Sequence, residues 1–293
     1  MHENGREAEL MVSPAHPSLY VARSLDSALD ALAERGAEGA PFAGGTWIMR
    51  APVRHERLSP AYVGVGRIAE LSRIERSDDH VVLGAGVTHA HIAEALRDLP
   101  DLRVLTEAAG RSANPAVRRA ATLGGNLCTA DFPAADLVPA LLCLDAEVDI
   151  ASRDGVERLT LERFLALRHS IEPGHLLTSV RVPRSLARSV HARLPLRKAG
   201  DYPTAILSLS VERDEAGCVT QVRVAVGAVE AVARRWPRLE GALIDSPLDA
   251  ASAHRAATEL AGEFDGREGI DVPGWYRVSV LPALVRRAVA ALH

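Results

Sequence analysis

The segments Ala43-Gly44-Gly45-Thr46 and Thr122-Leu123-Gly124-Gly125-Asn126 decide how this chain is interpreted, because each places a glycine pair where a strand pattern gives way to a helix pattern. Glycine lets the backbone approach a ligand closely and adopt positive φ, so several N–H groups can converge on one anion. A helix that begins after such a loop adds partial positive charge. Thr46, Thr122 and Asn126 can add side-chain donors. Two such loops predict a pyrophosphate that is held from both sides, as in a bound dinucleotide.

The alternative for any single glycine pair is a tight turn, because paired glycines are common without a ligand. Residues after the second pair favour a ligand site, because Thr129 follows it and Pro133-Ala134-Ala135-Asp136 comes next. We expect the Asp136 carboxylate to hydrogen-bond a sugar or ribityl hydroxyl, with capping of a helix over 137–144 as an alternative or additional role. Neither segment has the pattern of a Rossmann or P-loop site.

The bulk composition narrows the class of protein. The net charge of −4, from 34 basic and 38 acidic residues, provides no basic excess for binding nucleic acid. Cys128, Cys143 and Cys218 have neither iron–sulfur nor zinc spacing, so we expect no metal site and no disulfide framework on this chain. No apolar run approaches the roughly 20 residues of a membrane span, and no signal peptide is recognisable, so a cytoplasmic location is expected. Lys198 is the only lysine.

Apolar spacing and capping signals predict the elements around the glycines. Ser24 is expected to cap a helix, and Thr88 is expected to cap a second helix that follows a strand over 81–83. A further helical stretch over 106–111 is expected to end at the breaker Asn114-Pro115. Both glycine pairs are therefore expected in loops that precede helices.

A change of composition predicts where the chain divides. Residues 1–18 are polar and are expected to form a loose lead-in, and the stretch 183–195 is polar with two prolines. We therefore predict a first domain over 11–187 and a second over 190–293. Alternating apolar residues between 207 and 226 predict a hairpin with one solvated face, followed by two helices that pack on the other face.

Taken in order, these segments resemble the FAD-binding (medium) subunit of the molybdenum hydroxylases, the family of carbon monoxide dehydrogenase and xanthine dehydrogenase. The likeness includes the glycine segments and the Asp136 segment already quoted. It extends over nearly the whole chain through Leu83–His89, Leu176-Leu177 before Val180–Pro183, Leu196-Arg197-Lys198, and Trp275-Tyr276-Arg277.

The resemblance implies an α+β fold. Its first domain would have two α+β subdomains with FAD between them, as in the vanillyl-alcohol oxidase (PCMH) type. A smaller α+β C-terminal domain would carry an antiparallel sheet and helices. The Leu177 backbone would lie beside the flavin, and Lys198 would reach the cofactor unless it is a solvated surface cation. The residues implied to contact FAD are Ala43, Gly44, Gly45, Thr46, Trp47, Ile48, Thr122, Gly124, Gly125, Asn126, Thr129, Asp136, Leu177 and Lys198.

Three positions depart from the pattern of the family. Trp47 stands where a small or acidic residue is usual, and it either stacks near the cofactor or fills a gap in an aromatic-poor core. The segment Ala130-Asp131-Phe132 is one residue longer than the family pattern. Arg118-Arg119 stands where Arg-Asn is commoner, and it either faces an acidic surface of a partner or is solvated.

The resemblance also implies an electron relay rather than substrate chemistry on this chain. FAD would take electrons from iron–sulfur clusters and pass them to an external acceptor such as NAD⁺, oxygen or a quinone. Molybdopterin and 2Fe-2S clusters would belong to a large and a small partner subunit, in a dimer of heterotrimers. No catalytic side chain is expected, and His89 and His91 are expected to be helix caps or surface residues. The alternatives are a stand-alone FAD-dependent oxidoreductase on the same fold and a scaffold subunit that has lost FAD.

Overall fold

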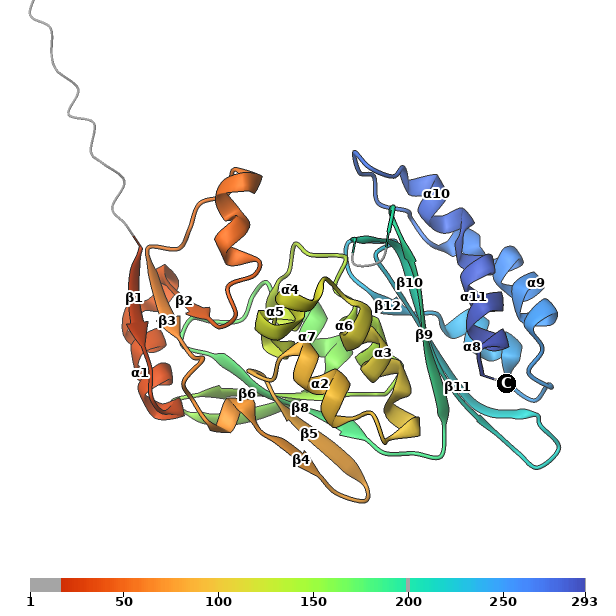
Figure 1. Ribbon diagram of the computed structural model, residues 1–293, viewed down its shortest axis with the longest axis horizontal. Helices are drawn as coiled ribbons and strands as arrows, with labels where there is room; N and C mark the ends of the chain where they lie inside the picture. Colours follow the sequence, from red (N-terminus) through yellow and green to blue (C-terminus); the bar gives the residue numbers. More distant parts are fainter. Residues whose placement is uncertain (1–16, 199–200, 293) are drawn as a thin grey trace, which may run out of the picture.

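The structure is a computed structural model that describes residues 17–198 and 201–292. The described strands form three sheets that follow one another along the long axis of the molecule (Figure 1). Most of the predicted lead-in over 1–18 lies outside the described residues, and Ser18 already begins the first strand.

The first sheet is small and parallel, with the order β1-β3-β2. It consists of β1 (Ser18–Val21), β3 (Ala61–Gly64) and β2 (Gly39–Phe42). Helix α1 (Leu25–Arg35) packs against β2 and β3. Ser24 and Ser27 form a capping box at its start, so the helix predicted from Ser24 is confirmed. The short 3-10 helices are η1 (Gly36–Glu38), η2 (Ile48–Arg54), η3 (Glu70–Ser72), η4 (Pro100–Leu102) and η5 (Ala261–Glu263).

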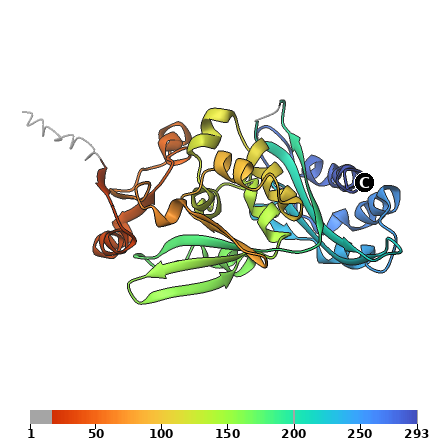
Figure 2. The same cartoon turned by 60° about the horizontal axis from the view of Figure 1, so that its bottom comes forward.

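The second sheet is antiparallel, with the order β4-β5-β8-β6-β7. Its strands are β4 (Ile74–Arg76), β5 (His80–Gly84), β8 (Leu176–Pro183), β6 (Glu147–Ser152) and β7 (Gly155–Thr160). Helices cover one face of this sheet, and its other face is open (Figure 2). These helices are α2 (His89–Ala95), α3 (Arg103–Arg111), α4 (Pro115–Ala120), α5 (Leu123–Cys128), α6 (Leu137–Leu142) and α7 (Leu161–Leu167).

Local capping explains where the helices nearest the glycines begin. The strand over 81–83 and the Thr88 cap are confirmed, because Thr88 Oγ1 accepts the N–H of His91 at 3.3 Å. The helix predicted over 106–111 ends at Arg111, before Asn114-Pro115 as expected, and this pair also begins α4. Asn114 Oδ1 accepts the Val117 N–H at 3.0 Å, and proline suits the first position of a helix because it has no N–H to lose.

The third sheet is antiparallel, with the order β12-β11-β10-β9. Helices α8 and α11 pack on one face, and α3 and α6, which also cover the second sheet, pack on the other (Figure 1). The expected solvated face is therefore wrong, since Ser208 and Ser210 are 0% and 5% exposed. The elements are β9 (Arg188–Pro195), β10 (Pro203–Arg213), β11 (Val219–Gly227), β12 (Arg234–Arg235), α8 (Pro237–Leu243), α9 (Ala250–Leu260), α10 (Gly274–Ser279) and α11 (Leu281–Ala290).

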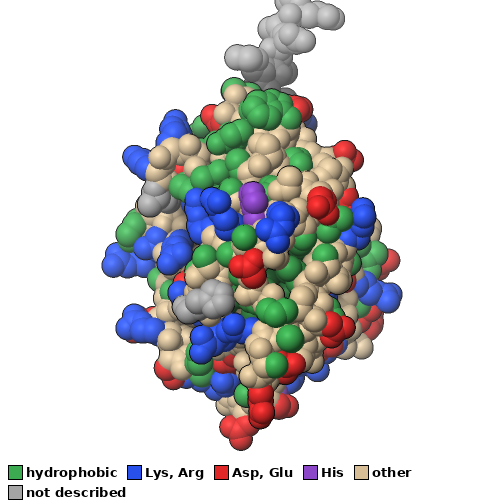
Figure 3. All heavy atoms as spheres, turned by 90° about the vertical axis from the view of Figure 1, so that its right-hand side faces the viewer, with side chains coloured by type: hydrophobic (Ala, Val, Ile, Leu, Met, Phe, Trp, Pro, Cys, Tyr) green, Lys and Arg blue, Asp and Glu red, His purple; other side chains and the backbone are tan. Residues whose placement is uncertain are grey.

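The surface at the α9–α10 end carries charged side chains of both signs, with hydrophobic side chains scattered among them (Figure 3). Among the described residues, no helix has the length and apolar character needed to cross a membrane. The division into 11–187 and 190–293 stays a prediction. Strand β9 begins at Arg188, just before the second of these ranges.

Candidate functional site

A cavity of about 790 Å³ lies where the three sheets and their connecting helices meet. That volume is typical of sites that enclose a small organic ligand. Lys198 is exposed in the bend after β9 and is not among the described residues of the wall, so its contact with the cofactor stays a prediction. The other predicted site residues all line the cavity: Ala43, Gly44, Gly45, Thr46, Trp47, Ile48, Thr122, Gly124, Gly125, Asn126, Thr129, Asp136 and Leu177.

The first glycine pair follows β2 and turns the chain into η2. A Cβ atom on Gly44 would lie 1.7 Å from the carbonyl oxygen of Ala120, so any larger residue would push the two segments apart. Gly45 has a φ of +69°, in the left-handed region that favours glycine. The pair thus packs the first segment directly against the start of the second, which brings both glycine pairs to one wall.

The second glycine pair lies in the first turn of α5 rather than in a loop before it. Thr122 caps this helix, because its Oγ1 accepts the Gly125 N–H at 3.1 Å. The N–H groups of Leu123 and Gly124 donate to carbonyls of the β5–α2 connection at 2.9 and 2.7 Å. These three N–H groups are already used within the protein, so the expectation that they converge on an anion is wrong.

The second segment contributes side-chain polar groups to the cavity wall, and it leaves space open beside Gly125. Thr122 Oγ1 accepts a hydrogen bond from the backbone, which leaves its own proton available to a phosphate oxygen. Thr129 Oγ1 donates to the Gly125 carbonyl at 2.6 Å, so it presents lone pairs. Asn126 Oδ1 accepts the Leu137 N–H at 3.2 Å and thereby joins α5 to α6. A Cβ on Gly125 would meet only Thr122 Oγ1, at 3.0 Å, so space is open there.

Asp136 is held by side chains of the third sheet. Its carboxylate is 2% exposed, and Oδ1 lies 2.7 Å from Nε of Arg193 and 3.4 Å from Nε2 of His191. His191 in turn lies 3.0 Å from the hydroxyl of Ser208 through Nδ1. Asp136 makes no capping hydrogen bond, so the alternative role as an N-cap is wrong. Because it also lines the cavity, its predicted contact with a sugar hydroxyl stays a proposal.

An aromatic wall joins two of the three departures from the family pattern, Trp47 and the 130–132 segment. The rings of Trp47 and Phe132 have centroids 4.6 Å apart, and Tyr202 packs edge-on to Phe132 at 5.6 Å. The guanidinium of Arg54 lies 3.8 Å from the Trp47 ring centroid, within cation–π range. Trp47 therefore packs against the longer 130–132 segment and lines the cavity at the same time.

Part of the cavity wall is apolar. Leu177 is 6% exposed on β8, where it pairs with Ile150 of β6. Phe164 and Ile171 complete this part of the wall. The geometry suits a ring system or a ribityl carbon chain better than a charged group, since a charge is costly to bury without a partner.

His89 and Arg168 are among the polar wall residues that were not predicted. His89 is 3% exposed and Thr88 is the cap, so the expectation of a cap or surface role is wrong for His89, whereas His91 is exposed. Burial is the main cause that lowers the pKa of His89 to about 4. Arg168 donates to the Leu127 and Ala130 carbonyls at 3.0 Å each, so it fixes the end of α5 and the segment that follows.

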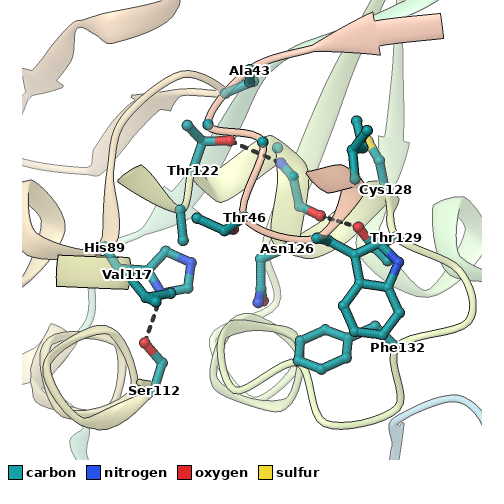
Figure 4. A pocket seen from close by; sticks show the side chains of 18 of the residues that line it. Ala43, Thr46, His89, Ser112, Val117, Thr122, Asn126, Cys128, Thr129 and Phe132 are labelled. Carbon is teal, nitrogen blue, oxygen red and sulfur yellow. Dashed lines mark hydrogen bonds between the residues drawn. The ribbon is translucent and has the colours of Figure 1, made fainter. Parts of the chain in front are cut away.

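The wall suits a nucleotide cofactor that also carries an apolar ring system. It contains two packed glycine segments, a hydroxyl donor and a buried carboxylate, together with apolar and aromatic side chains. Among the described residues, no cluster of His, Cys, Asp or Glu could hold a metal ion. Figure 4 shows the labelled Thr46, Thr122, Asn126 and His89 side chains around one space. Fold and wall together define an α+β cofactor-binding protein.

Comparisons with known proteins identify the family. Residues 13–185 match the FAD binding domain in molybdopterin dehydrogenase, and residues 192–292 match the CO dehydrogenase flavoprotein C-terminal domain. The chain is 34% identical over 288 residues to the 6-hydroxypseudooxynicotine dehydrogenase complex subunit alpha of Paenarthrobacter nicotinovorans, with 96% of each chain covered. It is 30% identical over 280 residues to the carbon monoxide dehydrogenase medium chain of Afipia carboxidovorans, which covers 91% of this chain and 93% of that one. Reconstituted CO dehydrogenase from Oligotropha carboxidovorans has the same fold, with a TM-score of 0.88 at 22% identity over 96% of this chain and 98% of that one.

The chain belongs to the FAD-binding flavoprotein subunits of molybdopterin-dependent dehydrogenases. FAD is its cofactor, and the chain is the electron-transfer component of an oxidoreductase. The predicted family, fold class, cofactor and enzyme class are confirmed.

Proposed function

We propose that the cavity holds FAD across both glycine segments, and that this chain relays electrons from iron–sulfur clusters of a partner to an external acceptor. The observation that carries the proposal is the convergence of segments 43–48 and 122–136 with Leu177 on one cavity. When bound, FAD supplies the chemistry, because it accepts electrons singly and stores two.

The chain's own residues bind and orient the cofactor. The Thr122 hydroxyl and the turn after Gly44 face the region we assign to the pyrophosphate. Asp136, fixed by Arg193, presents a buried carboxylate to a hydroxyl of the ribityl chain or a sugar. The wall formed by Trp47 and Phe132 excludes water from one side.

We further propose that the chain assembles with a small iron–sulfur subunit and a large molybdopterin subunit, as a dimer of heterotrimers in the cytoplasm. This is supported by relatives that are named as a subunit of a dehydrogenase complex and as a medium chain. Substrate oxidation would then take place on the large subunit.

Purification of the complex tests this function. We expect a flavin absorption band at about 450 nm, because oxidised flavins absorb there. We also expect iron–sulfur and molybdopterin chains to co-purify. An intact, folded complex without flavin would contradict the proposal. Turnover of a reductant by the isolated chain would favour a stand-alone oxidoreductase instead.

Trp47 provides a fluorescence test of where the cofactor binds. Of the three tryptophans, Trp47 lines the cavity, Trp236 is buried in the third unit and Trp275 is 69% exposed on α10. FAD added to the apo chain is expected to quench fluorescence, and Trp47→Phe should remove most of this quenching. Trp275→Phe is the matched control and should leave it. Equal quenching in both variants would place the cofactor elsewhere.

A further inference from the structure

His89 is a buried cavity residue with one unsatisfied nitrogen. It is the first residue of α2, and its N–H donates to the Ala121 carbonyl at 3.0 Å, so its backbone is tied to the second glycine segment. Its Nδ1 lies 2.7 Å from the Ser112 hydroxyl, while Nε2 has no hydrogen-bond partner among the described residues. Figure 4 shows the ring with Ser112 on one side and the cavity residues on the other.

The hydrogen bonds of Ser112 determine which ring nitrogen carries the proton. Ser112 Oγ also lies 3.1 Å from the carbonyl oxygen of Ala109, which is fully buried and can only accept. A hydroxyl has one proton, and we assign that of Ser112 to the Ala109 carbonyl, so that Ser112 accepts from His89. In this assignment the proton of the neutral ring is on Nδ1, and Nε2 is a bare acceptor.

The surroundings keep this ring neutral at physiological pH. Burial lowers the pKa of His89 to about 4, and Arg118 of α4 acts in the same direction. The Asp136 carboxylate opposes burial only in part, as does the nearby Thr122 carbonyl, which makes no hydrogen bond to Nε2. A neutral acceptor does not suit a phosphate oxygen, which is itself an acceptor, and it requires an O–H or N–H donor from the ligand.

We propose that Nε2 of His89 accepts a hydrogen bond from a hydroxyl or ring N–H group of the bound FAD. A sugar, the ribityl chain or a ring of FAD would then lie beside His89, and the pyrophosphate would lie in another part of the cavity. This inference rests on the proposed function, because it takes FAD as the occupant of the cavity. FAD offers such donors in its isoalloxazine–ribityl half and in its adenosine half, and the test distinguishes the two halves.

The test compares FAD binding by the apo forms of the wild-type chain, His89→Leu and His91→Leu. Leucine at position 89 removes the acceptor while Ser112 keeps its bond to Ala109, so the affinity for FAD should fall about tenfold. His91→Leu makes the same change at an exposed position of the same helix and should bind like wild type. His89→Gln, which can place an oxygen near the Nε2 position, should recover part of the affinity.

Binding of ADP locates the donor. If ADP binds both chains equally while FAD binds His89→Leu more weakly, the donor belongs to the isoalloxazine–ribityl half. If ADP also binds His89→Leu more weakly, the donor belongs to the adenosine half.

A second variant is available if thermal melting shows that His89→Leu does not fold. Ser112→Ala removes the Ser112 oxygen, which allows the ring of His89 to carry its proton on Nε2. That variant should also weaken FAD binding.

The pH dependence of FAD binding provides a result that could contradict the inference. We expect the ratio of FAD affinities between wild type and His89→Leu to stay constant from about pH 8 to about pH 6, since the ring remains neutral throughout. A ratio that rises with falling pH would mean that an imidazolium pairs with phosphate, and would overturn the inference. Equal FAD affinities of wild type and His89→Leu would overturn it as well. A wild-type chain that binds no FAD would instead contradict the proposed function.

Discussion

Gly125→Leu is expected to abolish FAD binding while the apo chain remains as stable as wild type. The new side chain has open space, because a Cβ at this position meets only Thr122 Oγ1 within 4 Å, at 3.0 Å. That space belongs to the cavity wall, so leucine would occupy volume that the cofactor needs. Leucine also favours a helix over glycine by about 1 kcal/mol, which offsets the close contact with Thr122.

A matched control makes this result specific. Gly241 is exposed within α8, and a Cβ there meets no atom within 4 Å, so Gly241→Leu adds the same side chain to a helix far from the cavity. FAD titration and thermal melting of both variants are the measurements. Retained FAD affinity in Gly125→Leu would exclude this wall from the site. A scaffold that has lost FAD would show no binding even in wild type.

Gly44 and Gly124 are weaker tests, for a physical reason. A Cβ on Gly44 would clash with the Ala120 carbonyl at 1.7 Å, and one on Gly124 would lie 3.0 Å from Ala85. Substitution at either position would disturb the packing of the protein itself. Substitution of Gly125 therefore tests FAD binding more directly than substitution of Gly44 or Gly124.

Features carried by contiguous residues could be predicted from the sequence. The Ser24 cap, the β5 strand before Thr88 and the segments that form the cavity wall all depend on neighbours within a few positions. Order along the chain then identified the family more reliably than any one motif. The helical position of Gly124 and Gly125 was missed, because glycine has low helix propensity and the Thr122 cap decides the start.

Features that depend on partners distant in sequence could not be predicted in the same way. The alternation around Ser208 predicts a strand with one solvated face, yet α3 and α6 cover that face. There Ser208 bonds to His191 of the neighbouring strand, and His191 in turn approaches Asp136 at the start of α6. His89 reads as a helix-start residue, and only the fold places Ser112 against it. Arg193 of β9 reaches Asp136, at the start of α6, although the two residues are 57 positions apart in the sequence.

Arg193→Leu is expected to lower the free energy of unfolding by about 3–5 kcal/mol. The side chains of Arg193 and Asp136 are 6% and 2% exposed, and the Nε to Oδ1 distance is 2.7 Å. Loss of the guanidinium leaves the carboxylate buried without its cation, since His191 lies farther away at 3.4 Å. Because the pair joins the start of α6 to β9, the loss also loosens the contact between the second and third sheets, and FAD affinity should fall with stability.

A double-mutant cycle separates the cost of the unpaired charge from other effects of the substitution. Asp136→Asn removes the charge and keeps the shape, so in the Arg193→Leu background it should restore most of the lost stability in chemical denaturation. Asp136→Asn alone should weaken FAD binding if the carboxylate accepts from a ribityl or sugar hydroxyl. Arg197→Leu is the matched control, because Arg197 is 78% exposed and pairs with Asp201 at 3.2 Å, an exposed contact that contributes about 0–1 kcal/mol. Equal stability losses in Arg193→Leu and Arg197→Leu would show that the buried pair does not hold the two sheets together.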